Sequence, residues 1–297
     1  MGMEPKLIEK FKKAGALTAE ARKFAESQVK EGAKLLDIAN SIENKIKQLG
    51  GKPAFPVNIS INEVAAHYVP KANDDLVLKK GDLVKIDFGV HIDGYAGDIA
   101  FSVSIGKNAE NEALIETAKA ALEAAIATVK PNIEVCKIGA AIESVVKKAG
   151  LQPIKNLSGH GIERFDLHAT PSIPNFDNAD KTKLESNTII AIEPFVTTGK
   201  GFVKEAENCE VYHIIKFAPI RDREILAYMQ TEFNTLPFAK RWLVEKFGVA
   251  RTANAIKEAV SRGVLYGHNT LREVSGAKVA QAEHTILIAD KITVLTK

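Results

Sequence analysis

Two segments of this chain, 100 positions apart, share a pattern of residues. Residues 29–53 and 129–153 align without a gap and agree at eight positions, which in the first segment are Val29, Lys30, Ile38, Ile42, Glu43, Lys47, Gly50 and Pro53. In both segments apolar residues recur at helical spacing and a glycine follows, which indicates a helix and its end. Thr18 is expected to cap an earlier helix. The sequence therefore predicts an internal duplication, with two related halves around a shared cleft.

A β-hairpin is predicted from the segment LVKIDFGVHIDGYAGDIAFSVSI in the first half. Two runs rich in Val, Ile and Phe flank Asp93-Gly94, a dipeptide that readily takes the positive φ angles of a two-residue turn. That turn sets a register in which Asp98 lies opposite Gly89, with Asp87 two residues further along the same face. The hairpin thus places two carboxylates close together.

The surroundings of these two carboxylates are apolar. Diagonal neighbours on one face of a sheet have Cβ atoms roughly 7–8 Å apart, which suits a pair of metal ions about 3.5–4 Å apart. Gly89 is expected to leave empty space between them. The alternative, a solvated strand residue at Asp87 and a turn residue at Asp98, conflicts with Ile86 and Phe88 on either side of Asp87. A carboxylate buried there needs a cation or hydrogen-bond donors.

Further candidate ligands lie in apolar stretches of the second half, namely His160 in NLSGHGIERFDLH, Glu193 in AIEPF and Glu283 in AEHTI. Taken singly, a histidine in an apolar stretch is usually a hydrogen-bonded core residue, and a glutamate beside proline is often a cap. Taken together with the hairpin, they make four carboxylates and one imidazole without a cysteine. Such a cluster would repel itself strongly unless divalent cations balanced its charge.

The composition bounds the class of protein. A chain of 297 residues with 45% hydrophobic content can bury a large core, as one large domain or two smaller ones. A net charge of +3 is too mild to indicate a nucleic-acid-binding protein. Cys136 and Cys209 form no motif and suit a reducing compartment. Because neither a signal peptide nor a run of 18 apolar residues is present, a cytoplasmic location without membrane contact is expected.

The segments KIDFGVHIDGYAGD, NLSGH, AIEPF and AEHTI resemble the type 2 methionine aminopeptidases, those of archaea in particular, and so does GGKPAFPVNISINEVAAH. The resemblance covers nearly the whole chain. It implies the pita-bread fold: an α+β architecture with a pseudo-two-fold duplication, an antiparallel sheet backed by helices, and a helical insertion. Residues 1–215 and 270–297 would form the catalytic domain. Residues 216–269 would form the insertion, where three helices are predicted.

The resemblance also implies a dinuclear centre with divalent Co, Mn, Fe or Zn. Asp98 and Glu283 would bridge the two ions. Asp87 would be a terminal ligand of one ion, and His160 and Glu193 would be terminal ligands of the other. A water activated by the metals would attack the first peptide carbonyl of the substrate.

The remaining roles implied by the resemblance concern the substrate, a nascent polypeptide with an N-terminal methionine. Glu193 would also move protons during the reaction. His67 and His168 would contact the scissile amide and stabilise the tetrahedral intermediate. Phe55 would form a wall of the methionine pocket.

Three residues depart from the family pattern without removing a ligand. Ile99 stands where Thr is usual, Ala282 where an aromatic residue is usual, and His268 where type 2 enzymes tend to have a pocket-lining Tyr. Neighbours of metal ligands often change affinity or activity by about 10–100-fold. The departures therefore bear on rate and pocket width rather than on the class of reaction.

Two other functions share these residues. An aminopeptidase P or prolidase has the same five ligands but usually a separate N-terminal domain, for which the early start of the repeat leaves no room. A non-catalytic pita-bread binding protein typically lacks metal ligands, whereas all five are present here. A monomer is expected. The insertion has a mild basic surplus, which favours a solvated packing module over contact with the ribosome.

Overall fold

The computed structural model describes residues 4–297. The helices are α1 (Pro5–Gln28), α2 (Leu35–Gln48), α3 (Ala109–Thr128), α4 (Val135–Lys148), α5 (Arg223–Glu232), α6 (Lys240–Phe247) and α7 (Val249–Ser261). The strands are β1 (Lys52–Pro53), β2 (Asn58–Ile61), β3 (Val64–Ala66), β4 (Leu83–Ile92), β5 (Tyr95–Ser104), β6 (Gln152–Pro153), β7 (Ser158–Glu163), β8 (Asp166–Pro174), β9 (Thr188–Ile192), β10 (Phe195–Thr197), β11 (Val203–Ile214), β12 (Phe238–Ala239), β13 (Leu265–Glu273), β14 (Val279–Gln281), β15 (His284–Ile288) and β16 (Thr293–Val294).

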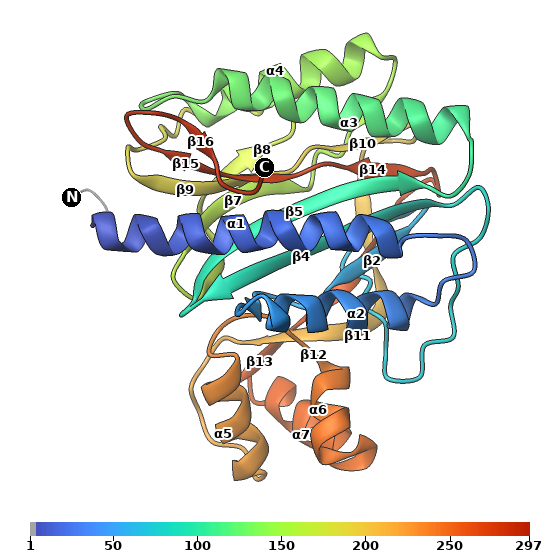
Figure 1. Cartoon of the computed structure of the whole chain (residues 1–297), viewed down its shortest axis with the longest axis vertical. Helices are drawn as coiled ribbons and strands as arrows, with labels where there is room; N and C mark the ends of the chain where they lie inside the picture. The colour runs from blue at the N-terminus through green and yellow to red at the C-terminus, as the bar shows by residue number, and fades with distance from the viewer. Residues whose placement is uncertain (1–3) are drawn as a thin grey trace.

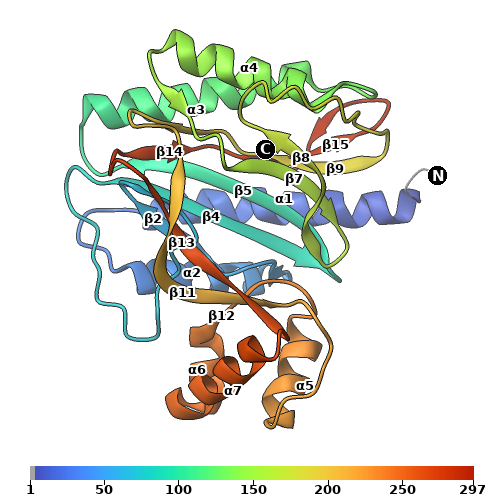
Figure 2. The ribbon, with the colours of Figure 1, turned by 180° about the vertical axis from the view of Figure 1, so that it is seen from behind.

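The strands form curved antiparallel sheets with helices on the outside. Helix α1 crosses in front of β4 and β5 in Figure 1 and behind them in Figure 2, where β11 and β13 cross the opposite side. One apolar core fills the space between α1, α2 and the β4–β5 hairpin. A second core lies between α3, α4 and strands β9, β14 and β15. Among residues 4–297, no helix combines the length and apolar character needed to cross a membrane.

The internal duplication is confirmed. Helices α2 and α4 begin and end at positions 100 residues apart, and β1 and β6 follow them at the same offset. A bridge between Lys34 and Val77 precedes α2, and a bridge between Glu134 and Lys183 precedes α4 in the same way. Each half therefore repeats the same helix and strand in the same order.

Thr18 does not cap a helix, and that prediction is wrong. Helix α1 begins at Pro5 and continues through Thr18, which is fully buried. Its hydroxyl donates to the Ala14 carbonyl oxygen at 2.9 Å and lies 3.3 Å from the Gly97 carbonyl oxygen. A threonine whose hydroxyl bonds the carbonyl four residues earlier is accommodated inside a helix, so a local cap pattern did not mark a helix start here.

The register of the β4–β5 hairpin is as predicted. Asp93 and Gly94 have φ angles of 53° and 87°, and Gly89 pairs with Asp98. The two-residue turn therefore brings Asp87 and Asp98 to the same face of the hairpin.

The three helices predicted after residue 216 are present as α5, α6 and α7, at the foot of the long β11–β13 ribbon (Figure 1). They pack around a small apolar core of their own, with members such as Met229, Phe238 and Leu243. Strand β13 begins at Leu265, so the last residues of the segment 216–269 continue into the ribbon.

Candidate metal centre

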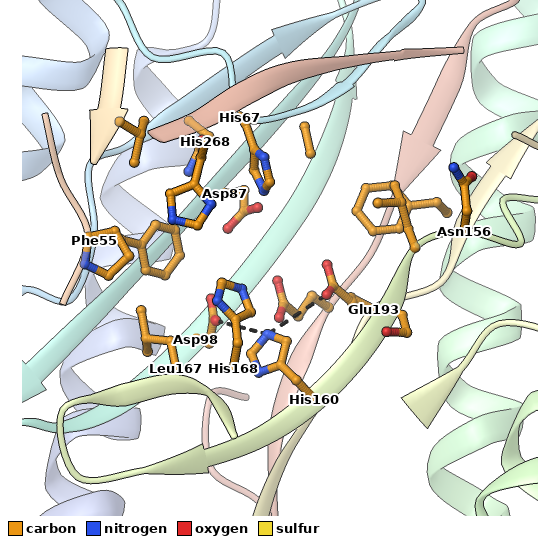
Figure 3. A pocket seen from close by; sticks show the side chains of 18 residues that line it. Phe55, His67, Asp87, Asp98, Asn156, His160, Leu167, His168, Glu193 and His268 are labelled. Carbon is orange, nitrogen blue, oxygen red and sulfur yellow. Dashed lines mark ion pairs between the residues drawn. The ribbon is translucent and has the colours of Figure 1, made fainter. Parts of the chain in front are cut away.

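All eight residues singled out from the sequence as site residues line one cavity of about 240 Å³ (Figure 3). They come from different strands and connections of both halves. The predicted ligands are Asp87 on β4, Asp98 on β5, His160 on β7, Glu193 after β9 and Glu283 before β15, and the other three are Phe55, His67 and His168.

The cavity floor brings together groups suited to a divalent cation. Ligand atoms of Asp98, His160 and Glu283 all lie within 4.8 Å of one another. The His160 Nε2 atom is 3.9 Å from Asp98 Oδ2 and 3.8 Å from Glu193 Oε1, and these contacts are drawn as dashed lines in Figure 3. Asp98, His160 and Glu283 are buried.

The tautomer of His160 is fixed by its backbone. Its Nδ1 lies 3.1 Å from the Gly161 carbonyl oxygen, and because a carbonyl only accepts hydrogen bonds, Nδ1 must carry the proton. Burial lowers the pKa of His160 to about 3, so Nε2 carries a lone pair at neutral pH. That lone pair faces the carboxylates of Asp98 and Glu193. Facing acceptors are stable when a cation lies between them, and the donor set therefore fits a metal ion.

The four carboxyl groups are held in a setting that opposes their ionisation without a cation. Burial raises the pKa of Asp87 to about 7. Burial first, and then the charge of Asp87, raises the pKa of Asp98 well above its usual value. Glu193 and Glu283 have raised pKa values from burial and from their acidic neighbours. Within the described residues, the buried Asp98 Oδ1 has no hydrogen-bond partner, which also fits a metal ligand.

Comparison with known proteins agrees with this donor set. The sequence model of metallopeptidase family M24 matches residues 9–289. The chain belongs to metallopeptidase family M24. The methionine aminopeptidase of Pyrococcus horikoshii is 45% identical over 295 residues, which cover 98% of this chain and 99% of that protein. The methionine aminopeptidase of Archaeoglobus fulgidus is 43% identical, over 99% of this chain and 100% of that protein.

Solved structures confirm the predicted pita-bread architecture. A methionine aminopeptidase from Thermotoga maritima superposes with a TM-score of 0.75 at 26% identity, over 100% of this chain and 99% of that one. A thermophilic Arx1 superposes with a TM-score of 0.86 at 19% identity, over 99% of this chain and 91% of that chain. The prolidase from Pyrococcus furiosus has a TM-score of 0.64 at 20% identity, over 99% of this chain and 64% of that chain. The last two likenesses concern the fold alone.

Two candidate metal ligands of this M24 chain, Asp98 and Glu283, are positioned by contacts between β5 and the C-terminal strands. The Asp98 amide donates to the Thr285 hydroxyl at 2.7 Å, and that hydroxyl lies 2.8 Å from the Asp98 carbonyl oxygen. The Glu283 amide donates to the Ala100 carbonyl oxygen at 2.9 Å. These bonds explain how Glu283, far along the chain, lies beside Asp98.

Gln281 is a site residue that the sequence reasoning missed. It is buried, and its amide Nε2 donates to Glu193 Oε2 at 3.1 Å and lies 3.5 Å from Asp87 Oδ2. The amide therefore orients two carboxylates from different halves. Its spacing of two residues from Glu283 was the available signal, since such residues share a face of an extended segment.

The other histidines of the cavity lie in two places in Figure 3, with His67 and His268 near Asp87 and with His168 beside His160. His67 has a φ of 63°, and its Nδ1 donates to the Asn269 carbonyl oxygen at 3.3 Å, which leaves Nε2 without a proton. Burial lowers the pKa of His67 to about 4 and also lowers that of His168. Both rings are therefore neutral near pH 7.

The three departures from the family pattern are separated in space. His268 lines the cavity, and its Nε2 is 2.8 Å from His213 Nδ1. Ile99 and Ala282 instead belong to the two apolar cores. Because neighbouring residues in a strand point to opposite faces, these two side chains pack behind the segments that carry the candidate ligands Asp98 and Glu283.

The space beside Gly89 is occupied, and the prediction of an empty space there is wrong. A Cβ atom at position 89 would lie 2.9 Å from Cε1 of Phe55 and 3.0 Å from the Cβ of Ala54. The glycine thus allows the ring of Phe55 to pack between the hairpin and the cavity. The prediction failed because the segment before β2 folds back over the hairpin.

Proposed function

We propose that this chain is a dinuclear-metal aminopeptidase that removes the N-terminal methionine from nascent polypeptides. The observation that carries the proposal is the convergence of five nitrogen and oxygen ligands from both halves on one cavity. Relatives named methionine aminopeptidase that are 38–45% identical over nearly the whole chain support the choice of substrate.

The proposal assigns two divalent ions, of Co, Mn, Fe or Zn, to the cavity. Asp98 and Glu283 would bridge them, and Asp87, His160 and Glu193 would be terminal ligands. Bound divalent ions supply Lewis acidity to a peptide carbonyl and lower the pKa of a water. The carboxylate and imidazole donors do not by themselves select one of these metals.

The chain's own residues then serve substrate binding and proton transfer. Glu193 is held by the Gln281 amide at 3.1 Å, and a carboxylate fixed at the cavity floor can carry a proton to the leaving amine. The neutral His67 has its Nε2 free, and a second ring, His168, lies beside the His160 ring at a centroid distance of 4.7 Å. The proposal assigns both rings to the scissile amide: the unprotonated Nε2 of His67 would accept a hydrogen bond from the amide N–H, and the N–H of the neutral His168 ring would donate to the carbonyl oxygen, where negative charge develops.

The shape of the cavity supports selection of a methionine residue with a free amine. Its apolar lining includes Phe55, Leu167 and Pro237, which suit an unbranched thioether side chain. The carboxylate-rich floor suits the positive α-amine of the substrate. An internal peptide bond offers no such amine, which accounts for exopeptidase action.

The proposal also covers the cellular setting. We place the chain in the cytoplasm as a monomer that acts on nascent chains. Ten Lys or Arg and six Asp or Glu lie between Lys216 and Glu273, the insertion and the strand that follows it, and this basic surplus is mild for ribosome contact. Its helices pack on their own apolar core, which supports a packing role. Cosedimentation with ribosomes at low and at high salt distinguishes these roles, because salt weakens a contact that depends on surface charge.

A peptide assay tests the reaction. The anaerobically purified protein is loaded with each candidate metal and incubated with Met-Gly-Met and with X-Pro peptides. We expect release of methionine from Met-Gly-Met, dependence on the metal, and little cleavage of X-Pro. Faster cleavage of X-Pro would favour a prolidase, and metal binding without any cleavage would favour a non-catalytic member of the fold.

A further inference from the structure

A buried carboxylate outside the metal centre joins the helical insertion to the wall of the substrate cavity. Glu43 lies on α2 in the first half, and Arg241 and Trp242 lie on α6 in the insertion. The Arg241 guanidinium donates through Nη2 to Glu43 Oε1, and the Trp242 indole donates to Glu43 Oε2 at 2.8 Å. The side chains of Glu43 and Arg241 are 5% and 0% exposed, so the pair is shielded from water.

The same carboxylate also holds the backbone next to the cavity wall. The Val57 amide donates to Glu43 Oε1 at 3.2 Å. Two residues earlier is Phe55, whose ring lines the cavity and packs against Gly89. The other end of this short segment is fixed by the Ala54 amide, which donates to the Gly89 carbonyl oxygen at 2.9 Å. Glu43 therefore holds the last amide of this segment before β2, which itself pairs with β4 from Asn58 onward.

The insertion contributes the facing part of the cavity. Pro237 lines it, just before β12 and α6, and its neighbour Leu236 shares an apolar cluster with Phe55. Because α6 is bonded to Glu43 and the Phe55 segment is bonded to the same carboxylate, a single group connects both walls. Displacement of Glu43 would change the distance between them.

The internal repeat provides a comparison within the same molecule. Glu143 occupies the equivalent position on α4, but it is only partly buried. Its Oε2 accepts a hydrogen bond from the Asp177 amide at 3.1 Å. Both copies thus bind a backbone amide of a following connection, whereas the described residues show contact with the insertion only for Glu43.

We propose that Glu43 is a positioning residue for substrate specificity, which sets the width of the methionine pocket by tying the Phe55 segment to the helical insertion. The proposal rests on the proposed aminopeptidase function. Glu43 touches neither the metal ligands nor the cavity, so its loss should alter KM and side-chain preference while kcat and metal content are retained.

Two triple variants separate positioning from stability. The background Arg241→Met/Trp242→Phe removes the two side-chain donors, so that no buried cation is left unpaired. In that background Glu43→Leu removes the acceptor of the Val57 amide, whereas Glu43→Gln keeps an acceptor oxygen. The single variants Glu43→Gln and Glu143→Leu complete the set. Melting temperature, metal content, and kcat and KM for Met-Gly-Met and its norleucine and leucine analogues are measured for each.

We expect the Glu43→Leu triple variant to raise KM for Met-Gly-Met about tenfold and to reduce the preference for methionine over leucine. The Glu43→Gln triple variant keeps the Val57 bond but has lost both bonds to α6, so its KM and preference should lie between those of wild type and of the Glu43→Leu triple variant, whereas Glu143→Leu should keep both near wild type. Equal KM and equal preference in the two triple variants would overturn the proposal. If the Glu43→Leu triple variant does not fold, Glu43→Gln alone decides, since an unchanged KM and preference there would equally overturn it.

Hydrogen exchange at the Val57 amide gives a readout that needs no substrate. Loss of protection in the Glu43→Leu triple variant, with protection kept in the Glu43→Gln triple variant, would support the positioning role, and equal protection would contradict it. A wild-type protein that protects this amide through Glu43 but releases no methionine would overturn the proposed function instead. The two failures are therefore distinguishable.

Discussion

Gly89 lies directly opposite Asp98 in the β4–β5 hairpin, and the ring of Phe55 packs over the glycine. One residue without a side chain thus allows a candidate metal ligand and the wall of the substrate cavity to approach each other. The arrangement connects the register of the hairpin to the width of the pocket.

Gly89→Ala tests this relationship. The new Cβ would lie 2.8 Å from the Gly97 carbonyl oxygen and 2.9 Å from Cε1 of Phe55, so the ring and the strand must both shift. We expect a loss of about 1–3 kcal/mol in unfolding free energy and a higher KM with metal content retained. Urea unfolding and peptide kinetics measure these effects. Phe55→Leu/Gly89→Ala should recover part of the lost stability, and a single variant with native stability and KM would contradict the packing argument.

Asp98→Asn tests the bridging role. An amide is a neutral, weaker ligand, so the variant should bind fewer than the two ions per chain proposed for the wild type. Metal analysis after dialysis, with isothermal titration, measures the stoichiometry. Asp93→Asn is the matched control, because Asp93 lies in the same hairpin, is 62% exposed and forms an ion pair with Lys10 at the surface. Two ions retained by Asp98→Asn would show that Asp98 is not a bridge.

Local chemistry explains why the hairpin and the repeated helices were predictable. Asp93-Gly94 determines the turn, strand alternation then determines which residues face the cavity, and helical spacing around Ile38 and Ile138 marks the two related helices. The grouping of the five candidate ligands was inferred from the duplication, their apolar surroundings and the balance of charge, whereas their separate roles were expected only from the family resemblance, because no local pattern relates Glu283 to Asp98.

The features that were missed depend on contacts between distant segments. Thr18 looked like a cap because the pattern is local, but its position is decided by packing against Gly97. The contact of Phe55 with Gly89 and the bond from Glu43 to α6 likewise arise from tertiary structure. Sequence periodicity carries no information on such pairs, since the residues that flank each partner would allow it to contact many other segments.

His67→Ala tests the assignment of a neutral imidazole to the scissile amide. The ring is held by the Asn269 carbonyl oxygen and does not belong to the group of ligand atoms around Asp98. We therefore expect kcat to fall by about 10²-fold or more, with both metal content and melting temperature near wild type. Steady-state kinetics and metal analysis on the same sample measure this. Loss of metal would assign His67 to the metal centre instead.

The pH dependence of stability is predicted from His91, which is buried near the hairpin turn and away from the candidate metal ligands. Its Nδ1 accepts a hydrogen bond from the Gly94 amide at 3.1 Å, a bond that requires the unprotonated nitrogen. Burial first, and then the positive charge of Lys52, lowers the pKa of His91 to about 4 from an ordinary value of 6.5.

This shift determines the sign of the effect. Between pH 6.5 and about 4 the unfolded chain binds a proton at His91 that the folded chain does not, so acidification favours unfolding. The loss of unfolding free energy from His91 is absent above pH 6.5 and grows as the pH falls. It levels off below pH 4 at roughly 3 kcal/mol. Urea unfolding of wild type and of His91→Gln at several pH values in this range isolates the effect of His91, since all other groups titrate in both proteins. The wild type should lose stability more steeply, and parallel curves would show that His91 keeps an ordinary pKa in the folded protein.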